Sequence, residues 1–569
     1  LMPIAVVDSV HILSEFADRY KKGDKANTVV TEVMKHLYKP MLFTSLTSAV
    51  GFFSLLLTPI PPVKIFGAFI GTGILLAFVL TILFIPAYIS RMSDHAIDSL
   101  HASVSRLEQK GLLSSALVRM GHFARTKGKI IIPVFVLVLA FRIEGITRIQ
   151  INDNPVNWFK ADHPIRVADK VLNEHFAGTY DAWLVLEAKI DTKAAKDDFK
   201  RALSQIKNQS QGQFHNHAQG LDLSAIESHL NAHGFDAQLL FMLDDLAFVA
   251  NEQDAESLAR LLQLAEAQLN HQKVFTQPAM LNWQSQLQAD LIASGLVGKV
   301  NAIPDIVKTV NRELQSGEDK DFAIPTTSDA VAQTLLQYQS SHRPQDLWHF
   351  VNTEYTSSLL WLQMTSGDNQ HMTDIVNWVN DYLERHPAPV AIQVNWAGKS
   401  YLNVVWQDLM VSGMLNSLLS SFLIVFLMMV LLFRSIKYGV LAMLPLTFTI
   451  TMIYGLIGWV GKAYDMPIAV LSALTLGLSI DFAIHFLQRL RELREELGSM
   501  KQALGQMCFE PSKAISRNAI VIAIGFTPLL LSPLVPYVTV GLFMASIMAV
   551  SALVTLILLP ALLTLFDRS

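Results

Sequence analysis

Long apolar runs, separated by short polar connectors, fill the beginning and the end of this chain, whereas its middle is mostly polar. Eight of these runs approach or exceed the length of about 20 residues that a membrane-spanning helix needs. Leu1 to Leu13 is expected to be the tail of another span. Arg142 and Glu144 shorten the third run, although long charged side chains can reach the membrane interface. The expected spans are Met41 to Leu57, Ile65 to Ile89, Ile130 to Ile146, Val411 to Phe433, Tyr438 to Val460, Pro467 to Leu487, Ala514 to Leu531 and Tyr537 to Phe566.

The composition agrees with a membrane protein. Of the 569 residues, 51% are hydrophobic and only 16% are charged, and the mean hydropathy is +0.35. These values are too apolar for an ordinary soluble protein. The net charge of −4 argues against a nucleic-acid partner. The single cysteine, Cys508, cannot form an intramolecular disulfide, and we expect it to be inert.

The apolar segments form a long internal repeat. His11 and His485 are 474 positions apart, and the same offset matches further residues from His11 to Pro86 without a gap. Chance does not supply so many matches of glycine, proline and histidine. The repeat predicts two copies of one helical bundle, with paired sites near the midplane of the membrane. The further matches are Gly51-Phe52 with Gly525-Phe526, Pro59 with Pro533, Pro62 with Pro536, Gly67 with Gly541 and Pro86 with Pro560.

Each copy carries one carboxylate and one imidazole inside an apolar run. Asp8 and His11 are three positions apart, and Asp481 and His485 are four apart, so each pair shares a helix face. Ionisable groups in a span are costly and indicate a proton or ion path. We therefore predict that Asp8, His11, Asp481 and His485 form a proton relay.

Other readings of these residues remain open. The aspartates could be structural acceptors satisfied by Thr44, Thr47 or Asn518. The histidines could lie only at the cytoplasmic mouth of the spans. Polar residues of the neighbouring runs are candidate relay partners, although serines in spans more often serve helix packing. These candidate partners are Thr44, Thr47, Ser48 and Asn518.

Basic residues predict the orientation in the membrane. They cluster in residues 19–39 of the first copy and in residues 489–513 of the second, whereas the connectors at the opposite ends of the spans carry few. We therefore place these clusters in the cytoplasm and Gln150 to Asp408 outside. Because Leu1 starts inside a span, we expect the chain to be a fragment whose N-terminal part is missing.

The outer region shows an alternation of strands and helices near its two ends. Ala182 to Ala188, Ser357 to Met364 and Val390 to Trp396 are expected strands, with helices at Lys193 to Ile206 and Met372 to Glu384. A further helix runs from Lys399 into the membrane, and Leu221 to Leu296 looks helical. This pattern predicts an α+β, ferredoxin-like domain.

Two smaller features of the outer region have ordinary explanations. His215, His217, His229 and His233 follow a spacing that zinc ligands can have, but their segment is polar and we expect solvated histidines and no metal site. Trp158-Phe159 is expected to be a core or interfacial anchor. The chain also lacks the G-x-S-x-G, P-loop and H-E-x-x-H motifs, which argues against an enzyme and against a nucleotide-driven pump.

Several motifs resemble those of one superfamily. Gly477-x-x-x-Asp481 followed by Phe482-Ala483-Ile484-His485-Phe486 is similar to the G-x-x-x-D span of resistance-nodulation-division (RND) proteins. Asn154-Pro155-Val156-Asn157-Trp158-Phe159 resembles the segment that opens the second outer domain in the lipid-exporting branch. Leu432-Phe433-Arg434-Ser435, with Pro445 and Gly455 following, matches that branch too. The branch includes hopanoid exporters and the mycobacterial membrane protein Large (MmpL) transporters, with Patched and Niemann-Pick proteins as distant relatives.

The resemblance implies twelve spans and two outer domains, of which this chain would hold spans four to twelve and the second domain. Two departures weaken a drug-pump interpretation. Ile4 stands where the first copy should have the motif glycine, and the intramembrane lysine of multidrug RND pumps has no counterpart near Asp481. His11 and His485 could take the place of that lysine as titratable partners.

The expected fold is a polytopic α-helical membrane protein with an internal bundle repeat and an α+β, ferredoxin-like extracytoplasmic domain. The expected parts are the end of a first bundle (1–90), a cytoplasmic linker (91–129), a helix that opens the second half (130–148), a periplasmic porter-like domain (149–408) and a second bundle (409–569).

The predicted function is proton-driven export of a hydrophobic or amphiphilic lipid, such as a hopanoid or sterol, across a bacterial inner membrane. The alternatives are a lipid sensor or scaffold of the same fold, and a multidrug efflux pump. We expect no cofactor, because the proton gradient supplies the energy. The expected partners are the lipid substrate, membrane lipids, periplasmic lipid-binding proteins and further copies of the chain. An elongated apolar cavity in the outer domain, fed from the outer leaflet, would suit such a substrate.

Overall fold

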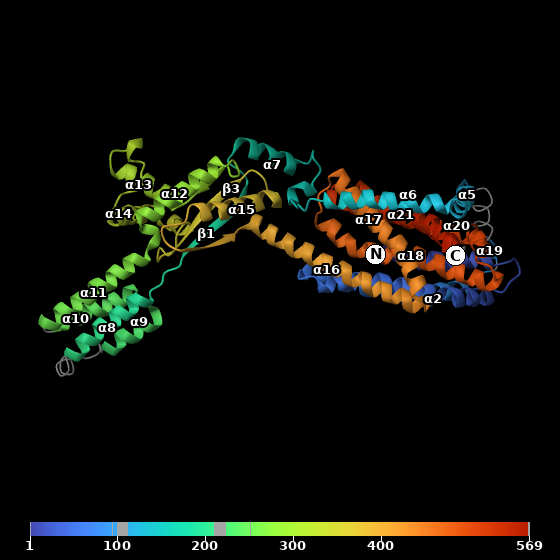
Figure 1. Cartoon of the computed structure of the whole chain (residues 1–569), viewed down its shortest axis with the longest axis horizontal. Helices are drawn as coiled ribbons and strands as arrows, with labels where there is room; N and C mark the ends of the chain where they lie inside the picture. Colours follow the sequence, from blue (N-terminus) through green and yellow to red (C-terminus); the bar gives the residue numbers. More distant parts are fainter. Residues whose placement is uncertain (1, 94, 100–111, 210–222, 251, 567–569) are drawn as a thin grey trace. The chain divides into compact units, whose positions relative to one another are not determined.

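The computed structural model describes residues 2–93, 95–99, 112–209, 223–250 and 252–566. The chain divides into two compact units. Leu1–Val167 and Asn403–Ser569 form the first, which we call the helical unit, and Ala168–Leu402 form the second, which we call the mixed unit. Figure 1 labels the elements of both.

Among the described residues, eight helices of the helical unit are long and apolar enough to cross a membrane. They coincide with the eight runs expected from the sequence, including the run shortened by Arg142 and Glu144, so the polytopic helical fold is confirmed. These spans are Ala26–Leu57, Pro61–Ile89, Gly128–Thr147, Lys399–Phe433, Ile436–Val460, Pro467–Leu497, Pro511–Leu531 and Val535–Leu565.

The elements of the helical unit are as follows. The first copy of the repeat consists of α1 (Met2–Arg19), α2 (Ala26–Phe53), η1 (Ser54–Leu57) and α3 (Pro61–Ile89). Two helices, α5 (Leu112–Thr126) and α6 (Gly128–Thr147), lead to η2 (Pro155–Trp158). After the mixed unit come α16 (Lys399–Phe433), α17 (Ile436–Val460), α18 (Met466–Leu497), α19 (Met500–Met507), α20 (Glu510–Phe526), η7 (Thr527–Leu531) and α21 (Val535–Phe566).

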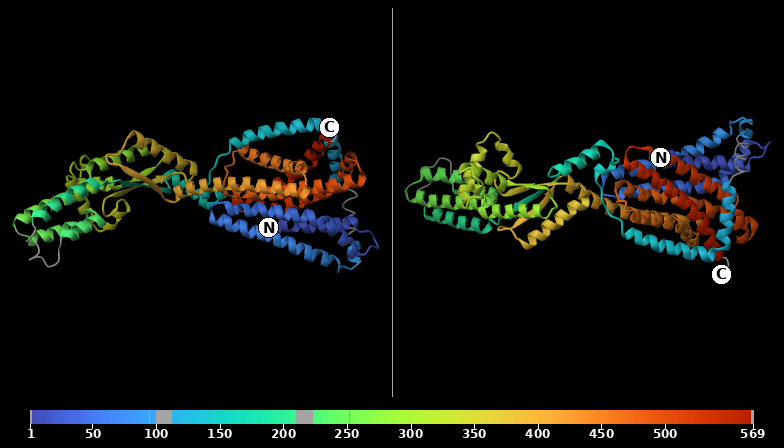
Figure 2. Two further views of the ribbon diagram at one scale, coloured as in Figure 1. Left: turned by 60° about the horizontal axis from the view of Figure 1, so that its bottom comes forward. Right: turned by 90° about the horizontal axis from the view of Figure 1, so that it is seen from above.

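The internal repeat is visible in the element bounds. The offset between His11 and His485 carries the first residue of α2 onto the first residue of α19, and the first residue of α3 onto that of α21. The 3-10 turns η1 and η7 also correspond. One difference is that α2 is continuous, whereas its counterpart is broken into α19 and α20 around Phe509, just before Pro511. Both views in Figure 2 show the first copy (blue) lying along the second (orange to red).

Two glycines explain part of the sequence repeat. A Cβ atom on Gly67 would collide with the Phe52 carbonyl oxygen and Leu55, and one on Gly541 would collide with the equivalent atoms of Phe526 and Leu529. In each copy, therefore, the glycine lets the third helix lie directly against the end of the helix before it. Close approach through small residues is the usual way in which membrane helices pack.

The mixed unit contains a four-stranded sheet in the order β2-β3-β1-β4, and every neighbouring pair is antiparallel. Its strands are β1 (Tyr180–Ala188), β2 (Lys299–Asn301), β3 (Ser357–Met364) and β4 (Ile392–Ala397). Tyr180 pairs with Met364, and Trp183 pairs with Ala397. Alternate residues of β1 and β3 are buried, which matches one covered face of a sheet. The α+β expectation is confirmed.

Helices precede and connect these strands in the chain order of a β-α-β-β-α-β unit with insertions. They are α7 (Pro164–His175), α8 (Lys193–Gln209), α9 (Leu223–His233), α10 (Ala237–Val249), α11 (Glu252–Gln272), α12 (Pro278–Ala293), α13 (Ile303–Leu314), α14 (Ser328–Gln339) and α15 (Asn369–Arg385). Short 3-10 turns are η4 (Val274–Thr276), η5 (Asp319–Asp321) and η6 (Pro344–His349).

Helices α8 to α11 form an insertion with its own core. Leucine, isoleucine and phenylalanine side chains from all four helices are buried against one another, among them Phe199, Leu230, Leu243 and Leu261. The sequence predicted helices here but not a separate bundle. Because the cluster is self-contained, we call residues 193–272 the insertion bundle.

Candidate proton-relay site

The four relay candidates lie on two helices, one from each copy of the repeat. Asp8 and His11 are on α1, and Asp481 and His485 are on α18. The imidazole rings of His11 and His485 stack, with their centroids 4.2 Å apart and their planes 23° apart. The structure therefore brings the two motifs, which are far apart in the sequence, into direct contact.

The two carboxylates have different surroundings. Asp8 accepts a hydrogen bond of 3.0 Å from the Ser45 hydroxyl of α2. Asp481 has one oxygen, Oδ1, that is buried without a hydrogen-bond partner in the described part of the chain. Asp8 and Asp481 are close enough for their charges to interact. A buried carboxylate oxygen without a donor is costly while it is charged, which favours uptake of a proton at this place.

Helix α20 contributes two groups to the histidine pair. The Asn518 amide nitrogen lies 3.0 Å from Nδ1 and 2.5 Å from Nε2 of His11. The Arg517 guanidinium is within electrostatic range of the same imidazole. Asn518, predicted as a relay partner, thus lies beside a histidine. The charge of Arg517 so close to His11 was not foreseen.

Within the described residues, the remaining candidate partners do not contact the relay residues through a hydrogen bond: two donate within their own helix, and one packs against a neighbouring helix. The Thr44 hydroxyl donates to the Met41 carbonyl, and the Thr47 hydroxyl donates to the Thr44 carbonyl, both within α2. Ser48 lies against Gly477, where a Cβ atom would be 2.6 Å from the Ser48 Cα. The motif glycine therefore permits close contact between α2 and α18, one turn before Asp481.

Sequence reasoning missed Ser45 and Arg517. Ser45 lies in the same Thr/Ser-rich stretch as Thr44 and Ser48, so the stretch was found but not the residue that faces Asp8. Arg517 was detectable as a lone cation inside the apolar run of α20. Only the tertiary contact between helices shows which polar residue of such a run reaches the site.

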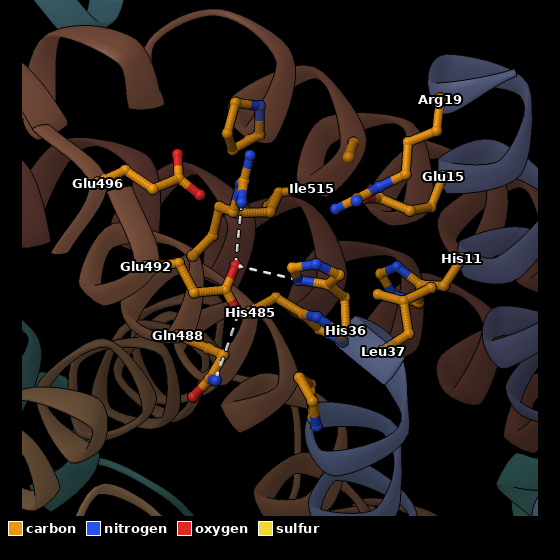
Figure 3. A pocket seen from close by; sticks show the side chains of 14 residues that line it. His11, Glu15, Arg19, His36, Leu37, His485, Gln488, Glu492, Glu496 and Ile515 are labelled. Carbon is orange, nitrogen blue, oxygen red and sulfur yellow. Dashed lines mark hydrogen bonds and ion pairs between the residues drawn. The ribbon is translucent and has the colours of Figure 1, made fainter. Parts of the chain in front are cut away.

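A cavity of about 320 Å³ leads to the histidine pair (Figure 3). It lies at the end of the helices where α1 ends and α2 begins. Charged and polar side chains line it in addition to the two histidines: Glu15, Arg19, His36, Gln488, Arg489, Glu492 and Glu496.

Most of these side chains are paired along the cavity wall, mainly with a neighbour on the same helix. Arg489 binds Glu492 at 3.0 Å, and the His36 Nδ1 atom lies 3.9 Å from the same carboxylate. Arg19 binds Glu15 at 2.6 Å. The Asp residues precede their histidines by about one helical turn, so they lie on the far side of the histidine pair from the cavity. Water in the cavity would therefore meet the imidazoles before the carboxylates.

One histidine of the pattern in the mixed unit, His229, has a structural role. His229 Nε2 lies 2.9 Å from the Asp236 carboxylate, which also accepts the Leu239 N–H at the start of α10. Burial opposes ionisation of Asp236, but these hydrogen bonds outweigh it and lower the pKa of Asp236. His233 lies beside His229, and His215 and His217 fall outside the described residues. No cluster of three or more potential metal ligands occurs in the part of the chain that the structure describes.

Two other residues from the sequence analysis are placed as follows. The Trp158 indole donates to Asp153 at 2.9 Å, and Phe159 forms a backbone bridge with Leu534, in the connector between η7 and α21. Cys508 is buried beside α5, and burial raises the pKa of its thiol.

The chain matches known families at its beginning and at its end. Residues 351–569 match the MMPL family, and residues 2–91 match the Patched SSD family. Over nearly its whole length the fold is similar to the hedgehog release protein Disp from the water bear Hypsibius dujardini. That similarity has a TM-score of 0.54 and 14% sequence identity, and it covers 99% of this chain and 62% of the other.

Two proteins of microbes are similar in sequence over part of the chain. A membrane protein of Methanocaldococcus jannaschii is 23% identical, covering 43% of this chain and 62% of its own length. The apo-petrobactin exporter of Bacillus anthracis is 21% identical, covering 46% of this chain and 36% of its own length. The chain thus spans less than two thirds of these relatives.

The fold is that of a polytopic helical membrane protein. Its family matches, to the MMPL family and the Patched SSD family, make parts of the chain similar to RND/MmpL-type proteins.

Proposed function

We propose that this chain acts as a proton-driven RND-type transporter that exports a hydrophobic or amphiphilic molecule. The observation that carries the proposal is the contact between His11 and His485, with Asp8 and Asp481 one turn away, inside helices from both copies of the repeat. A scaffold or sensor would not need two titratable pairs at such a place, because ionisable groups in spans are costly.

The cavity supports a route for protons to the pair. Protons from its water would reach the imidazoles of His11 and His485 first, and then Asp481 or Asp8. Neutralising a buried carboxylate removes the cost of its charge and changes which arrangement of α1 against α18 is most stable. Rocking of the two copies would then drive export.

A lipid-like substrate is supported by helix α7, which exposes several apolar side chains beside its exposed charged residues. Two of its polar side chains bind the protein: Arg166 donates to the Phe159 carbonyl, and the Asn173 side chain accepts the Thr179 N–H. Apolar side chains of the helix, including Leu172, are exposed, and so is Phe176 directly after it, by 66%. A run of exposed apolar side chains suits an amphiphile.

A second candidate substrate is apo-petrobactin, because one relative is named as an apo-petrobactin exporter. The multidrug efflux pump named in the sequence analysis is a further alternative function. The elongated apolar cavity expected in the mixed unit stays a prediction.

Transport in proteoliposomes tests the proposal. Vesicles with an imposed pH gradient would contain either a fluorescent fatty acid or apo-petrobactin, and the movement of each compound would be followed with the wild-type chain. We expect the fatty acid to move, and Asp481→Asn and Asp8→Asn each to abolish its movement. Asp24→Asn, which changes an exposed loop carboxylate, is the matched control. Unchanged transport in both relay variants would refute proton coupling, and movement of apo-petrobactin alone would refute a lipid substrate.

We place the protein in a bacterial inner membrane with the mixed unit in the periplasm. Its expected partners there are lipid-binding proteins and further copies of the chain. Cys508 is the single cysteine of the sequence, so a Cys508→Ser background is free of cysteine. New single cysteines can be placed in that background for labelling. An impermeant maleimide should label Ser341→Cys in intact spheroplasts but not Lys22→Cys. The reverse pattern would overturn this orientation.

A further inference from the structure

The helical unit contains a second, smaller pocket, remote in sequence from the relay residues. Its volume is about 110 Å³, and it lies where α5 meets α6 and the end of α21. Its lining includes Arg125, Lys127, Gly128, Lys129, Thr564 and Leu565. Because α6 begins and α21 ends at this pocket and both are spans, it lies at the depth of the lipid headgroups.

Within residues 2–93, 95–99, 112–209, 223–250 and 252–566, the cations of this pocket have no counterion. No carboxylate in the described ranges forms an ion pair with Arg125, Lys127 or Lys129. The Arg125 Nε atom is buried without a hydrogen-bond partner among those residues. Three cations gathered around one small pocket repel one another unless an anion neutralises them.

Backbone donors add to the positive potential. Lys127 precedes the first residue of α6, and its side chain does not cap the helix. The Ile130 and Ile131 N–H groups donate to the Lys127 carbonyl, whereas those of Gly128 and Lys129 have no acceptor among the described residues. These two N–H groups carry the positive end of the helix dipole. The Thr126 and Thr564 hydroxyls donate to carbonyls of their own helices, so the ammonium groups and backbone N–H groups are the donors left for a ligand.

The rim of the pocket is apolar. Ile130 and Leu565 line the pocket and are 58% and 40% exposed. Phe123, which lies on α5 outside the pocket lining, is 52% exposed. The opposite face of α5 is buried, because Leu117 and Ala124 lie against the rest of the helical unit. A helix with one buried face and an exposed aromatic residue beside a cationic pocket has the character of a helix at the membrane surface.

We propose that this pocket binds the phosphate group of an anionic phospholipid, with Lys127, Lys129 and the first turn of α6 around the phosphate and the acyl chains along Ile130. Free phosphate shares the anionic chemistry but gains nothing from the apolar rim. Basic pockets between membrane helices are known to hold such headgroups. The site is separate from the proton relay and does not depend on the transport proposal.

Native mass spectrometry of the whole purified chain tests the site. The chain would be titrated with dioctanoyl phosphatidylglycerol, with dioctanoyl phosphatidylcholine and with inorganic phosphate. We expect phosphatidylglycerol to bind and phosphatidylcholine to bind much more weakly. The double variant Lys127→Gln/Lys129→Gln should weaken binding of phosphatidylglycerol on the order of 30-fold, from the usual contribution of a lysine near an anionic lipid.

The matched control is Lys35→Gln/Lys39→Gln, which removes two exposed lysines of α2 and the same amount of charge. It should change the affinity less than twofold. An equal loss in the control would show unspecific attraction and overturn the proposal. Binding of inorganic phosphate as tight as that of the lipid, with the same dependence on Lys127 and Lys129, would overturn the lipid assignment. Equal binding of the two lipids would exclude an anionic headgroup site.

Discussion

At the scale of single residues, the histidine pair combines two roles that one substitution can separate. Stacking needs only an aromatic ring, whereas proton transfer needs the imidazole nitrogens. His11 also has the Asn518 amide and the Arg517 charge beside it, and His485 borders the cavity. The charged groups that face the pair therefore come from α1, α2, α18 and α20.

A phenylalanine at position 485 should preserve the stack but stop proton transfer. We expect the free energy of unfolding of His485→Phe to lie within about 1 kcal/mol of the wild-type value, because the ring contact is retained. The pH dependence of transport should nevertheless change toward that of the aspartates alone. His349→Phe, an exposed histidine of the mixed unit, is the control. A wild-type pH profile for His485→Phe would make the histidine purely structural.

The hydrogen bond from Ser45 to Asp8 gives a second prediction. Ser45→Ala removes the donor that the structure assigns to this carboxylate, which should cost about 1 kcal/mol of stability while Asp8 is charged. The pH dependence of transport should then shift to higher pH, because the charged form of Asp8 has lost its hydrogen-bond donor. Thr47→Ala is the comparison, because the Thr47 hydroxyl donates only within α2. Equal effects of the two substitutions would contradict a specific role for Ser45.

At the scale of elements, the sequence predicted most of what the structure contains. The apolar runs predicted all eight spans, because a helix needs about 20 consecutive apolar residues to cross the hydrocarbon core of a membrane. The alternation in Ser357 to Met364 predicted β3 to the residue. Neither pattern could predict the stack of His11 on His485, because periodicity fixes the face of a helix but not the partner that it meets. The insertion bundle was missed for the same reason.

Close contact between α2 and α18 makes Gly477 a sensitive position. A Cβ atom there would meet the backbone of Ser48, which cannot move aside as a side chain can. Gly477→Ala should therefore destabilise the helical unit by about 1–3 kcal/mol and impair transport. In Gly505→Ala the new atom would meet the flexible end of Arg125, so the expected cost is small. A thermal melt of both variants decides between these outcomes.

The start of α10 offers a test in the mixed unit. Asp236 caps this helix and binds His229, and its pKa is lowered in the folded state. Its stabilising contribution is thus complete above the unfolded pKa of about 4 and is lost as the pH falls below it. Asp236→Ala should cost about 1 kcal/mol at neutral pH. Below pH 4 the difference between variant and wild type should shrink, which chemical denaturation at several pH values would reveal.

At the scale of the whole molecule, the insertion bundle is attached to the sheet at one place. Before it, the Ala188 N–H donates to the Thr356 carbonyl, and after it, the Phe275 N–H donates to the Tyr355 carbonyl. The two ends of the insertion therefore lie at adjacent residues of a single segment. An insertion with close ends and its own core is expected to fold independently.

Removal of the insertion bundle tests this independence. Replacement of residues 190–273 by a short Gly/Ser linker should leave the sheet folded, and the excised segment should be helical by circular dichroism. Transport by the shortened chain would show that the bundle is not part of the pathway. An unfolded excised segment would contradict a self-contained core.

The stack of His11 on His485 also bears on the history of the molecule. These residues occupy equivalent positions in the two copies, so their contact marks the axis that relates the copies. Before the two copies were joined, a single-copy ancestor pairing with itself would have stacked one histidine on the same histidine of its twin, as two-fold symmetry requires. Divergence then made the halves unequal: Asn518 lies beside one ring, whereas the equivalent position of the other copy is Thr44. One half could thereafter specialise without loss of the shared contact.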